Sequence, residues 1–387
     1  MSRARIDPVI FFSALGLNVF GVVMVFSASQ ILALDRYGDA FHFVKRHVMW
    51  AAVGFALMLL LARMDVRTLR RFAFPLLVLS WVILALVFVP GFGRAAGGAR
   101  RWMALGPLSF QPAEAAKFGL LVFIAHFLAV KGERLRDLRY GFLPPVLITG
   151  VAVLLILGQP DLGTAMLVAL VVGMLLFLAG ARWHHLLGCA LVVAPVFYWL
   201  VFSVPWRRRR ILAFLDPFGA VREAGYQLVQ SLLALGRGGV TGLGLGEGKQ
   251  KLLYLPEPHT DFIFAVIGEE LGLIGTLAVA AVFAVILWRG LCIAARCEDG
   301  FRFLLAAGIT LMVSVQGLLN MAVASGLVPT KGVPLPLISL GGTSLVFTLA
   351  GLGLLLAVEA GTRPAAAPAR GAPLDAAAAW PAAGGTD

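Results

Sequence analysis

Apolar runs long enough to cross a membrane occupy most of this 387-residue chain. A helix needs about 20 consecutive apolar residues to cross a hydrocarbon core about 30 Å thick. Hydrophobic residues make up 60% of the sequence and charged residues only 13%, a balance that no soluble domain of this length needs. We therefore predict an all-α, polytopic membrane protein. The short alternating strands of a membrane β-barrel are excluded by the length of the runs.

The runs predict about ten transmembrane helices. The first run is too long for a signal peptide and lacks a small-residue cleavage site, so we interpret it as a retained span. The expected spans cover residues 9–32, 47–63, 72–90, 115–131, 141–158, 161–180, 184–203, 262–288, 303–326 and 338–360. Together they predict one membrane domain over 1–362, with a large loop at about 204–261. The Ala-, Pro- and Gly-rich tail, 363–387, is predicted to be disordered and cytoplasmic.

The distribution of basic residues predicts the orientation. With the N-terminus in the cytoplasm, the inside segments carry 16 Lys and Arg residues and the short outside loops carry 7. The positive-inside rule then places both termini in the cytoplasm and the 204–261 loop outside. Much of the net charge of +12 is this orientation signal, so it does not indicate nucleic-acid binding. The exception is the run WRRRR at 206–210, for which a lipid-headgroup contact and a contact with an anionic substrate both remain open.

A packed polar cluster stands directly before the apolar run that begins at residue 262. Ionisable groups at a bilayer boundary are costly to bury, so they are usually kept for chemistry or transport. Two more acids follow about two helical turns later, either as functional groups or as side chains solvated in a water-filled vestibule. The cluster comprises Glu257, His259, Thr260 and Asp261, and the later acids are Glu269 and Glu270.

Other polar positions have a structural and a functional interpretation. Glu114 and Lys117 are three residues apart on one helix face, so they form either a self-neutralising ion pair or a polar wall of an outward-facing cavity. For Asp161 we favour a helix cap at a tight turn between two spans. The Pro- and Gly-rich stretch 326–344 predicts a non-helical connection at membrane depth.

The glycines between residues 236 and 248 do not form a phosphate-binding loop. Leu243 stands where that motif requires glycine, and Gln250 stands where it requires Ser or Thr. We predict instead a flexible outside loop whose backbone can approach a ligand closely. The segment before it, 225–235, predicts a short amphipathic helix on the membrane surface. No His or Cys spacing supports a bound metal or haem.

Four segments together resemble the SEDS family of bacterial shape, elongation, division and sporulation proteins. They occur in order between about residues 100 and 350, and the ten-span layout fits the family as well. Within the family they are more similar to the division members than to the elongation members. The sequence departs from the family pattern in two places, at Ala113 and at Leu340 with Thr343, and neither departure removes a charged group. The segments are RRWMALGPLSFQPAEAAK, QPDLGTAM, GYQLVQSLLALGRGGVTGLGLGEGKQKLLYLPEPHTDFIFAVIGEELGLIG and GLVPTKGVPLPLISLGGTS.

The resemblance implies a peptidoglycan glycosyltransferase of cell division. It would polymerise lipid II, the undecaprenyl-diphosphate-linked disaccharide-pentapeptide, on the outer face of the bacterial cytoplasmic membrane at the septum. It would work with a class B penicillin-binding protein, a transpeptidase, and with other divisome proteins. The family's catalytic carboxylate maps onto Asp261, and its cavity residues map onto Glu114, Lys117 and Arg101. Further candidates for substrate binding in the matching segments are His259, Lys331 and Ser344.

The chemistry of glycosyl transfer from a diphosphate-linked sugar requires a carboxylate base and positive charge, which these residues can supply. The donor sugar is α-linked to its diphosphate and the product linkage is β, so one inverting displacement is enough, with Asp261 as general base for the acceptor's 4-hydroxyl. The leaving diphosphate needs positive charge from Lys117, Arg101 or a divalent cation such as Mg or Mn, and no organic cofactor is expected. The alternatives are a lipid II flippase, which needs a polar path through both leaflets, and a non-catalytic divisome scaffold.

Overall fold

The computed structural model describes residues 6–96, 99–105, 108–219, 225–249, 255 and 258–362, so Glu257 and the tail predicted to be disordered lie outside the described residues. Ten apolar helices dominate it, one for each predicted span, and the polytopic helical prediction is confirmed. Eight are long enough to cross a membrane, while α4 and α7 are shorter. They are α1 (Pro8–Tyr37), α2 (His42–Leu61), α4 (Ala73–Leu86), α5 (Pro112–Lys131), α6 (Leu143–Gly158), α7 (Leu162–Leu178), α8 (Trp183–Phe202), α11 (Ile263–Ala295), α12 (Gly300–Ala324) and α13 (Gly342–Thr362).

Short elements fill the connections. Helix α3 (Val66–Arg71) precedes α4, a 3₁₀ turn (Gly132–Arg136) and a π turn (Leu138–Phe142) join α5 to α6, and α9 (Pro205–Leu215) and α10 (Tyr226–Gly238) lie in the large loop. A three-stranded antiparallel sheet of order β1-β2-β3 joins α4 to α5, with β1 (Gly93–Ala96), β2 (Ala99–Leu105) and β3 (Leu108–Phe110). The all-α prediction did not include this sheet, because its strands are too short to show an alternating pattern.

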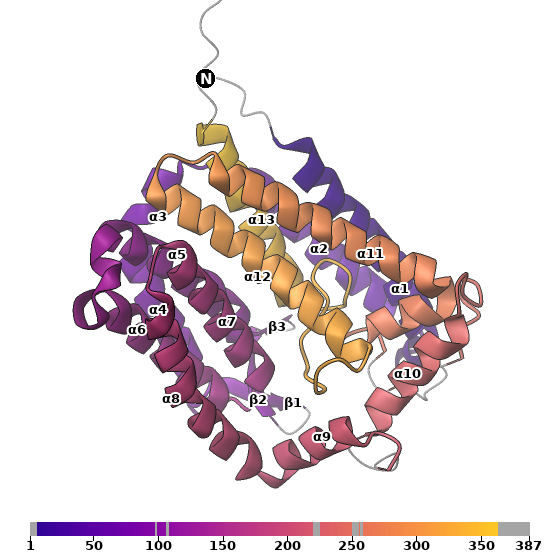
Figure 1. The fold of residues 1–387 in the computed structure, drawn as a ribbon. Helices are drawn as coiled ribbons and strands as arrows, with labels where there is room; N and C mark the ends of the chain where they lie inside the picture. Colours follow the sequence, from indigo (N-terminus) through magenta and orange to yellow (C-terminus); the bar gives the residue numbers. More distant parts are fainter. Residues whose placement is uncertain are drawn as a thin grey trace, which may run out of the picture.

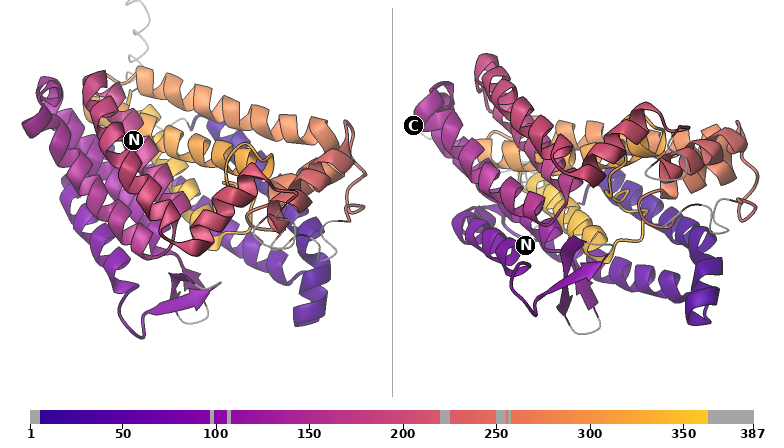
Figure 2. Two further views of the ribbon diagram at one scale, coloured as in Figure 1. Left: turned by 60° about the horizontal axis from the view of Figure 1, so that its bottom comes forward. Right: turned by 90° about the horizontal axis from the view of Figure 1, so that it is seen from below.

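The core of the bundle is formed by α5, α12 and α13, the most buried of the long helices. Helix α12 contacts α5, α7, α11 and α13, while α2 packs along α13 and α4 along α5. Helix α8 stands apart at the edge of the bundle and continues into α9 (Figures 1 and 2). Only Val201 of α8 is buried, so the helix presents apolar side chains to the surroundings on nearly every face.

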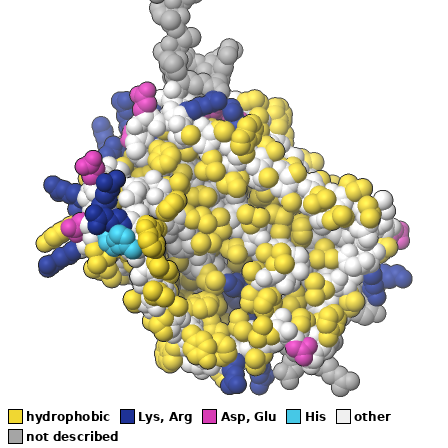
Figure 3. All heavy atoms as spheres, in the orientation of Figure 1, with side chains coloured by type: hydrophobic (Ala, Val, Ile, Leu, Met, Phe, Trp, Pro, Cys, Tyr) yellow, Lys and Arg dark blue, Asp and Glu magenta, His cyan; other side chains and the backbone are white. Residues whose placement is uncertain are grey.

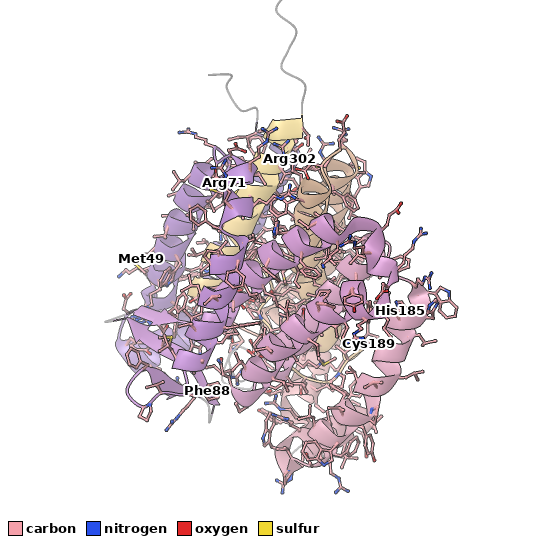
Figure 4. All side chains as sticks on the ribbon, turned by 90° about the vertical axis from the view of Figure 1, so that its left-hand side faces the viewer. Met49, Arg71, Phe88, His185, Cys189 and Arg302 are labelled. Atoms are coloured by element: carbon pink, nitrogen blue, oxygen red, sulfur yellow. The ribbon has the colours of Figure 1, made fainter. Side chains whose placement is uncertain are left out.

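Both ends of the described chain lie at one end of the bundle. Arg289 of α11 donates to Asp7 Oδ2 at 2.6 Å and lies 3.7 Å from Glu359 Oε1 of α13, which brings the start of α1 and the end of α13 together. Arg71 and Arg302 lie at this same end, and Phe88 lies at the other (Figure 4). The face of the molecule in Figure 3 is mostly hydrophobic between the charged side chains at its edges, as expected for a multi-pass membrane protein.

Helix α11 is broken at Gly272, where the backbone adopts φ +65° and ψ −160°. Leu273 N and Ile274 N donate to Gly239 O and Val240 O of the glycine-rich loop instead of to the helical carbonyls. Those carbonyls, on Glu269 and Glu270, in turn accept from two amides of the same loop, Leu243 N at 3.0 Å and Gly244 N at 3.0 Å. The loop therefore replaces the helical hydrogen bonds that the break removes.

This pairing bears on two expectations for the large loop. The glycine-rich backbone approaches helix α11 closely, whereas its approach to a ligand stays a prediction. Helix α10 is amphipathic as predicted, yet it packs its buried face, which includes Leu228, Ser231 and Ala234, against α11 and α12 rather than resting only on the membrane surface. Ser231 Oγ donates to Ala324 O of α12 at 2.6 Å.

We expect Gly272→Ala to destabilise the protein by at least about 1–3 kcal/mol, because an alanine is strained at this φ. Its Cβ would also lie against the backbone of Val240 and Gly242. Thermal unfolding of the purified variants measures this effect. Gly173→Ala is the control, since a Cβ at Gly173 of α7 meets nothing within 4 Å. Equal transition temperatures for the two variants would contradict this role of the break.

Candidate active site

A cavity of about 1190 Å³ lies between the sheet, α9, the turn before α11 and the loop between α12 and α13. It brings together four of the predicted site residues, Asp261, Arg101, Lys331 and Ser344, from segments that are far apart in the sequence. The walls also include aromatic rings from Trp102 and Trp206. The polar lining consists of Arg101, Gln111, Asp161, Arg207, Arg209, Arg210, Gln227, Thr260, Asp261, Thr330, Lys331 and Ser344.

The charge of the cavity is strongly positive, because its lining contains five basic side chains and two acids. One of the acids, Asp161, caps α7 as predicted: its carboxylate accepts from Thr164 N at 3.0 Å and from Thr164 Oγ1 at 2.9 Å. The other acid is Asp261. Three of the basic residues come from the 206–210 run, which places that run against the cavity and favours an anionic ligand over a lipid headgroup alone.

Asp261 lies in the turn immediately before α11, at the cavity wall. Its Oδ2 is 3.0 Å from the point where a Cβ on Gly332 would stand, and Arg101 Nη1 is 3.8 Å from the same point. The carboxylate and the guanidinium therefore face one glycine, and glycine leaves the carboxylate the most room. A reacting hydroxyl and a negatively charged leaving group could both be accommodated in this arrangement.

Burial perturbs the pKa values of two basic groups in the cavity, and for one of them a neighbouring positive charge adds to the effect. Burial lowers the pKa of Lys331 to about 8, and its Nζ donates to Met166 Sδ at 2.6 Å. The pKa of Arg210 is lowered by burial and by the nearby charge of Arg101, while Asp261 acts in the opposite direction. Binding of an anion among these groups would relieve both effects and favour their charged forms.

Glu114 and Lys117 lie outside the cavity lining and form a buried ion pair. Lys117 Nζ is 2.9 Å from Glu114 Oε2, and each residue is 2% exposed. Lys117 Nζ also donates to Gln316 Oε1 of α12 at 2.8 Å. The ion-pair interpretation is thus confirmed, whereas direct substrate contact by these two residues stays a prediction.

His259 is also placed away from the cavity lining. It is 3% exposed, and its ring packs on Phe43 of α2 with the ring centroids 4.6 Å apart. Its role in substrate binding therefore stays a prediction. His126, within the span α5, is hydrogen-bonded and accepts from Arg70 Nε at 3.3 Å.

The acids Glu269 and Glu270 are fully buried, so the solvated-vestibule alternative is wrong. Glu269 Oε1 accepts from Lys249 N at 3.0 Å, and the Glu270 carboxylate accepts from Ser27 Oγ of α1 at 2.7 Å. Both acids belong to the first half of α11 and hold the end of the glycine-rich loop and α1. They support the region behind Asp261 without lining the cavity.

Two amides of α12 in the neighbourhood of the site, Gln316 and Asn320, were missed in the sequence. Their spacing of four residues puts them on one helix face, and polar side chains inside an apolar span are the signal that could have found them. Gln316 Nε2 donates to Pro334 O at 3.1 Å, and Asn320 Nδ2 donates to Asp261 O at 2.8 Å.

The cavity lining contains two carboxylates, and a divalent cation held there together with a diphosphate stays a prediction. Within the part of the chain that the structure describes, no three His, Cys, Asp or Glu side chains are grouped so that they could hold an ion. Of the two carboxylates in the cavity lining, Asp161 is engaged as a helix cap. Positive charge in the cavity is supplied by arginine and lysine side chains.

Comparison with known proteins agrees with this architecture. A family model for FtsW, RodA and SpoVE, described as cell cycle protein, matches residues 8–363. The chain is 46% identical over 355 residues to a probable peptidoglycan glycosyltransferase FtsW from Geobacter sulfurreducens, covering 92% of this chain and 95% of that protein. It is 40% identical to stage V sporulation protein E of Bacillus subtilis, covering 89% of this chain and 94% of that protein.

Two solved structures have the same fold. One is a chain from a peptidoglycan synthase complex described as coordinating polymerization and crosslinking, with a TM-score of 0.77 and 32% identity over 92% of this chain and 98% of that chain. The other is the rod shape determining protein RodA of Thermus thermophilus, with a TM-score of 0.68 and 32% identity over 92% of this chain and 97% of that chain.

Proposed function

The chain belongs to the FtsW, RodA and SpoVE family of cell cycle proteins, and on that premise we propose that it is a peptidoglycan glycosyltransferase with Asp261 as its general base. The observation that carries the proposal is the position of the Asp261 carboxylate in a cavity whose lining contains five basic side chains and only one other acid, Asp161, which caps α7. Lipid II combines an acceptor hydroxyl, which needs a base, with a diphosphate, which needs positive charge.

The reaction follows as one inverting displacement. The 4-hydroxyl of the acceptor sugar attacks the anomeric carbon of the donor, and the bond from that carbon to the diphosphate oxygen breaks. Asp261 takes the hydroxyl proton, and the undecaprenyl diphosphate leaves with the bonding electrons. The α-linked donor thereby becomes a β-linked product.

Positive charge on the protein stabilises the leaving group. We propose that Arg101, Arg210 and Lys331 share this role, because all three line the cavity that contains Asp261. No group of three or more His, Cys, Asp or Glu side chains occurs among the described residues, so no step is assigned to a divalent cation, and its assistance to the leaving diphosphate stays a prediction.

The surroundings of the protein are proposed on the same premise. Both termini are cytoplasmic, which puts the cavity end of the bundle and the 204–261 loop on the outer face of the bacterial cytoplasmic membrane. The 46% identity to an FtsW supports a role at the division septum. The proposed partners are a class B penicillin-binding protein transpeptidase, as in a peptidoglycan synthase complex, and other divisome proteins.

We expect Arg210→Gln to raise the KM for lipid II about 10- to 100-fold, because a charge-assisted hydrogen bond contributes about 1.5–3 kcal/mol. Polymerisation kinetics of the purified variant measure this. Arg208→Gln is the matched control, since Arg208 is on the same helix and exposed but is absent from the cavity lining. An equal rise in the KM for lipid II in both variants would indicate that the 206–210 run binds only lipid headgroups.

Polymerisation in detergent tests the proposed function against the flippase and scaffold alternatives. Without a sealed bilayer there is nothing to transport across, so a glycosyltransferase forms glycan strands from lipid II and a flippase does not. The assay contains the purified protein and its transpeptidase partner, whose crosslinking is blocked with a β-lactam. Glycan strands support the proposal. Their absence, together with transfer of labelled lipid II between leaflets in proteoliposomes, would support the flippase.

A further inference from the structure

The turn that carries Asp261 is held at three consecutive backbone carbonyls. His259 O accepts from Leu340 N at 3.0 Å, and Thr260 O accepts from Ser339 Oγ at 2.6 Å. The third carbonyl, Asp261 O, accepts from Asn320 Nδ2 at 2.8 Å. The first two donors come from the loop between α12 and α13, whereas the third comes from inside helix α12.

Asn320 contacts both walls of the site with one amide group. Besides Asp261 O, its Nδ2 donates to Val333 O at 2.8 Å, so both of its N–H groups are used. Val333 directly follows Gly332, the residue that lies against the Asp261 carboxylate. Asn320 therefore connects the segment that bears the carboxylate with the loop that the carboxylate faces.

Neither carbonyl belongs to a regular element. Asp261 precedes the first residue of α11, and Val333 lies in the non-helical connection between α12 and α13. Asn320 itself is 1% exposed, within the core helix α12. Backbone groups outside helices at membrane depth need partners from the protein, and a rigid core helix is the most precise place from which to supply them.

We propose that Asn320 is a positioning residue for Asp261, which fixes the distance between the carboxylate and the cationic loop at Lys331 and Gly332. This inference rests on the proposed role of Asp261 as general base. A displacement of about 1 Å at a reacting group can cost about 100-fold in rate, so the loss of the amide is expected to lower kcat.

Asn320→Asp and Asn320→Leu test the inference. The aspartate keeps the shape of the side chain and replaces two donors with acceptors, and the leucine removes both donors. We expect kcat for lipid II polymerisation to fall about 10- to 100-fold in each, with KM changed less than about twofold, since the diphosphate-binding side chains remain. Ser314→Ala on the same helix is the control. Ser314 is also 1% exposed, and its Oγ makes no hydrogen bond to the described residues, so kcat should not change.

Kinetics and thermal unfolding of the same preparations decide the outcome. Folded Asn320 variants with wild-type kcat would overturn the inference. So would variants that have a lowered transition temperature but wild-type kcat at assay temperatures below that transition. If the aspartate and leucine variants do not fold, Asn320→Ser is measured with the same two outcomes. Asp261→Asn is assayed in parallel: its full activity would refute the proposed function, whereas its inactivity beside fully active Asn320 variants would refute the positioning role alone.

Discussion

Asp261→Asn is expected to lower the rate of lipid II polymerisation about 10²- to 10⁴-fold, because an amide cannot take the proton of the acceptor hydroxyl. The substitution keeps the size of the side chain, so the cavity and its five basic side chains should be retained. Binding of lipid II should therefore change little, and removal of a negative charge from a cationic cavity should even strengthen it. Steady-state kinetics of the purified variant with the proposed transpeptidase partner measure both effects.

Asp299→Asn is the matched control for this prediction. Asp299 caps α12 by accepting from Phe301 N at 2.9 Å, and asparagine is an equally good helix cap. It is absent from the cavity lining, so its polymerisation rate should equal that of the wild type. A folded Asp261→Asn protein with the full polymerisation rate would exclude Asp261 as the base and would require another group of the protein to take the hydroxyl proton.

Lys117→Met is expected to destabilise the protein by about 3–5 kcal/mol, because it leaves the Glu114 carboxylate buried without its cation. Both residues are 2% exposed, so solvent cannot compensate for the loss. The Gln316 side chain would also lose the bond to Lys117 Nζ, and Gln316 holds the loop through Pro334 O. Thermal unfolding in detergent would show a markedly lower transition temperature.

The double variant Glu114→Gln with Lys117→Met distinguishes stability from substrate contact. It removes both charges, so it should recover much of the stability that the single variant loses. A single Lys117→Met variant with an unchanged transition temperature and a raised KM for lipid II would contradict this account. That result would show that Lys117 acts on the substrate, as the resemblance to the family implies.

The spans could be predicted from the sequence because each needs only a local property, a run of about 20 apolar residues. The break in α11 could not be predicted in the same way. At the break, Gly272 has a positive φ, and the backbone on either side of it forms hydrogen bonds with a loop some 30 residues earlier. Hydropathy contains no signal for such pairing. The same holds for the sheet, where strands of four, seven and three residues carry no readable alternation.

The sequence showed which charged residues of the site are unusual, but it showed less about which residues lie next to one another in the fold. Asp261 stood out because an acid at the start of an apolar run is costly. Glu114 and Lys117 stood out for the same reason, yet they neutralise each other away from the cavity lining. From the sequence alone, the 206–210 run could contact either lipid or substrate. The position of α9 against the cavity favours the substrate contact.

The dependence of kcat on pH tests most directly whether Asp261 is the general base. The base must be ionised, so the wild-type rate should fall with unit slope as pH falls through the pKa of the essential carboxylate. In Asp261→Asn that acid limb should be absent from the residual rate, because the titrating group is gone. The same acid limb persisting in Asp261→Asn would show that another group takes the proton and would contradict the account.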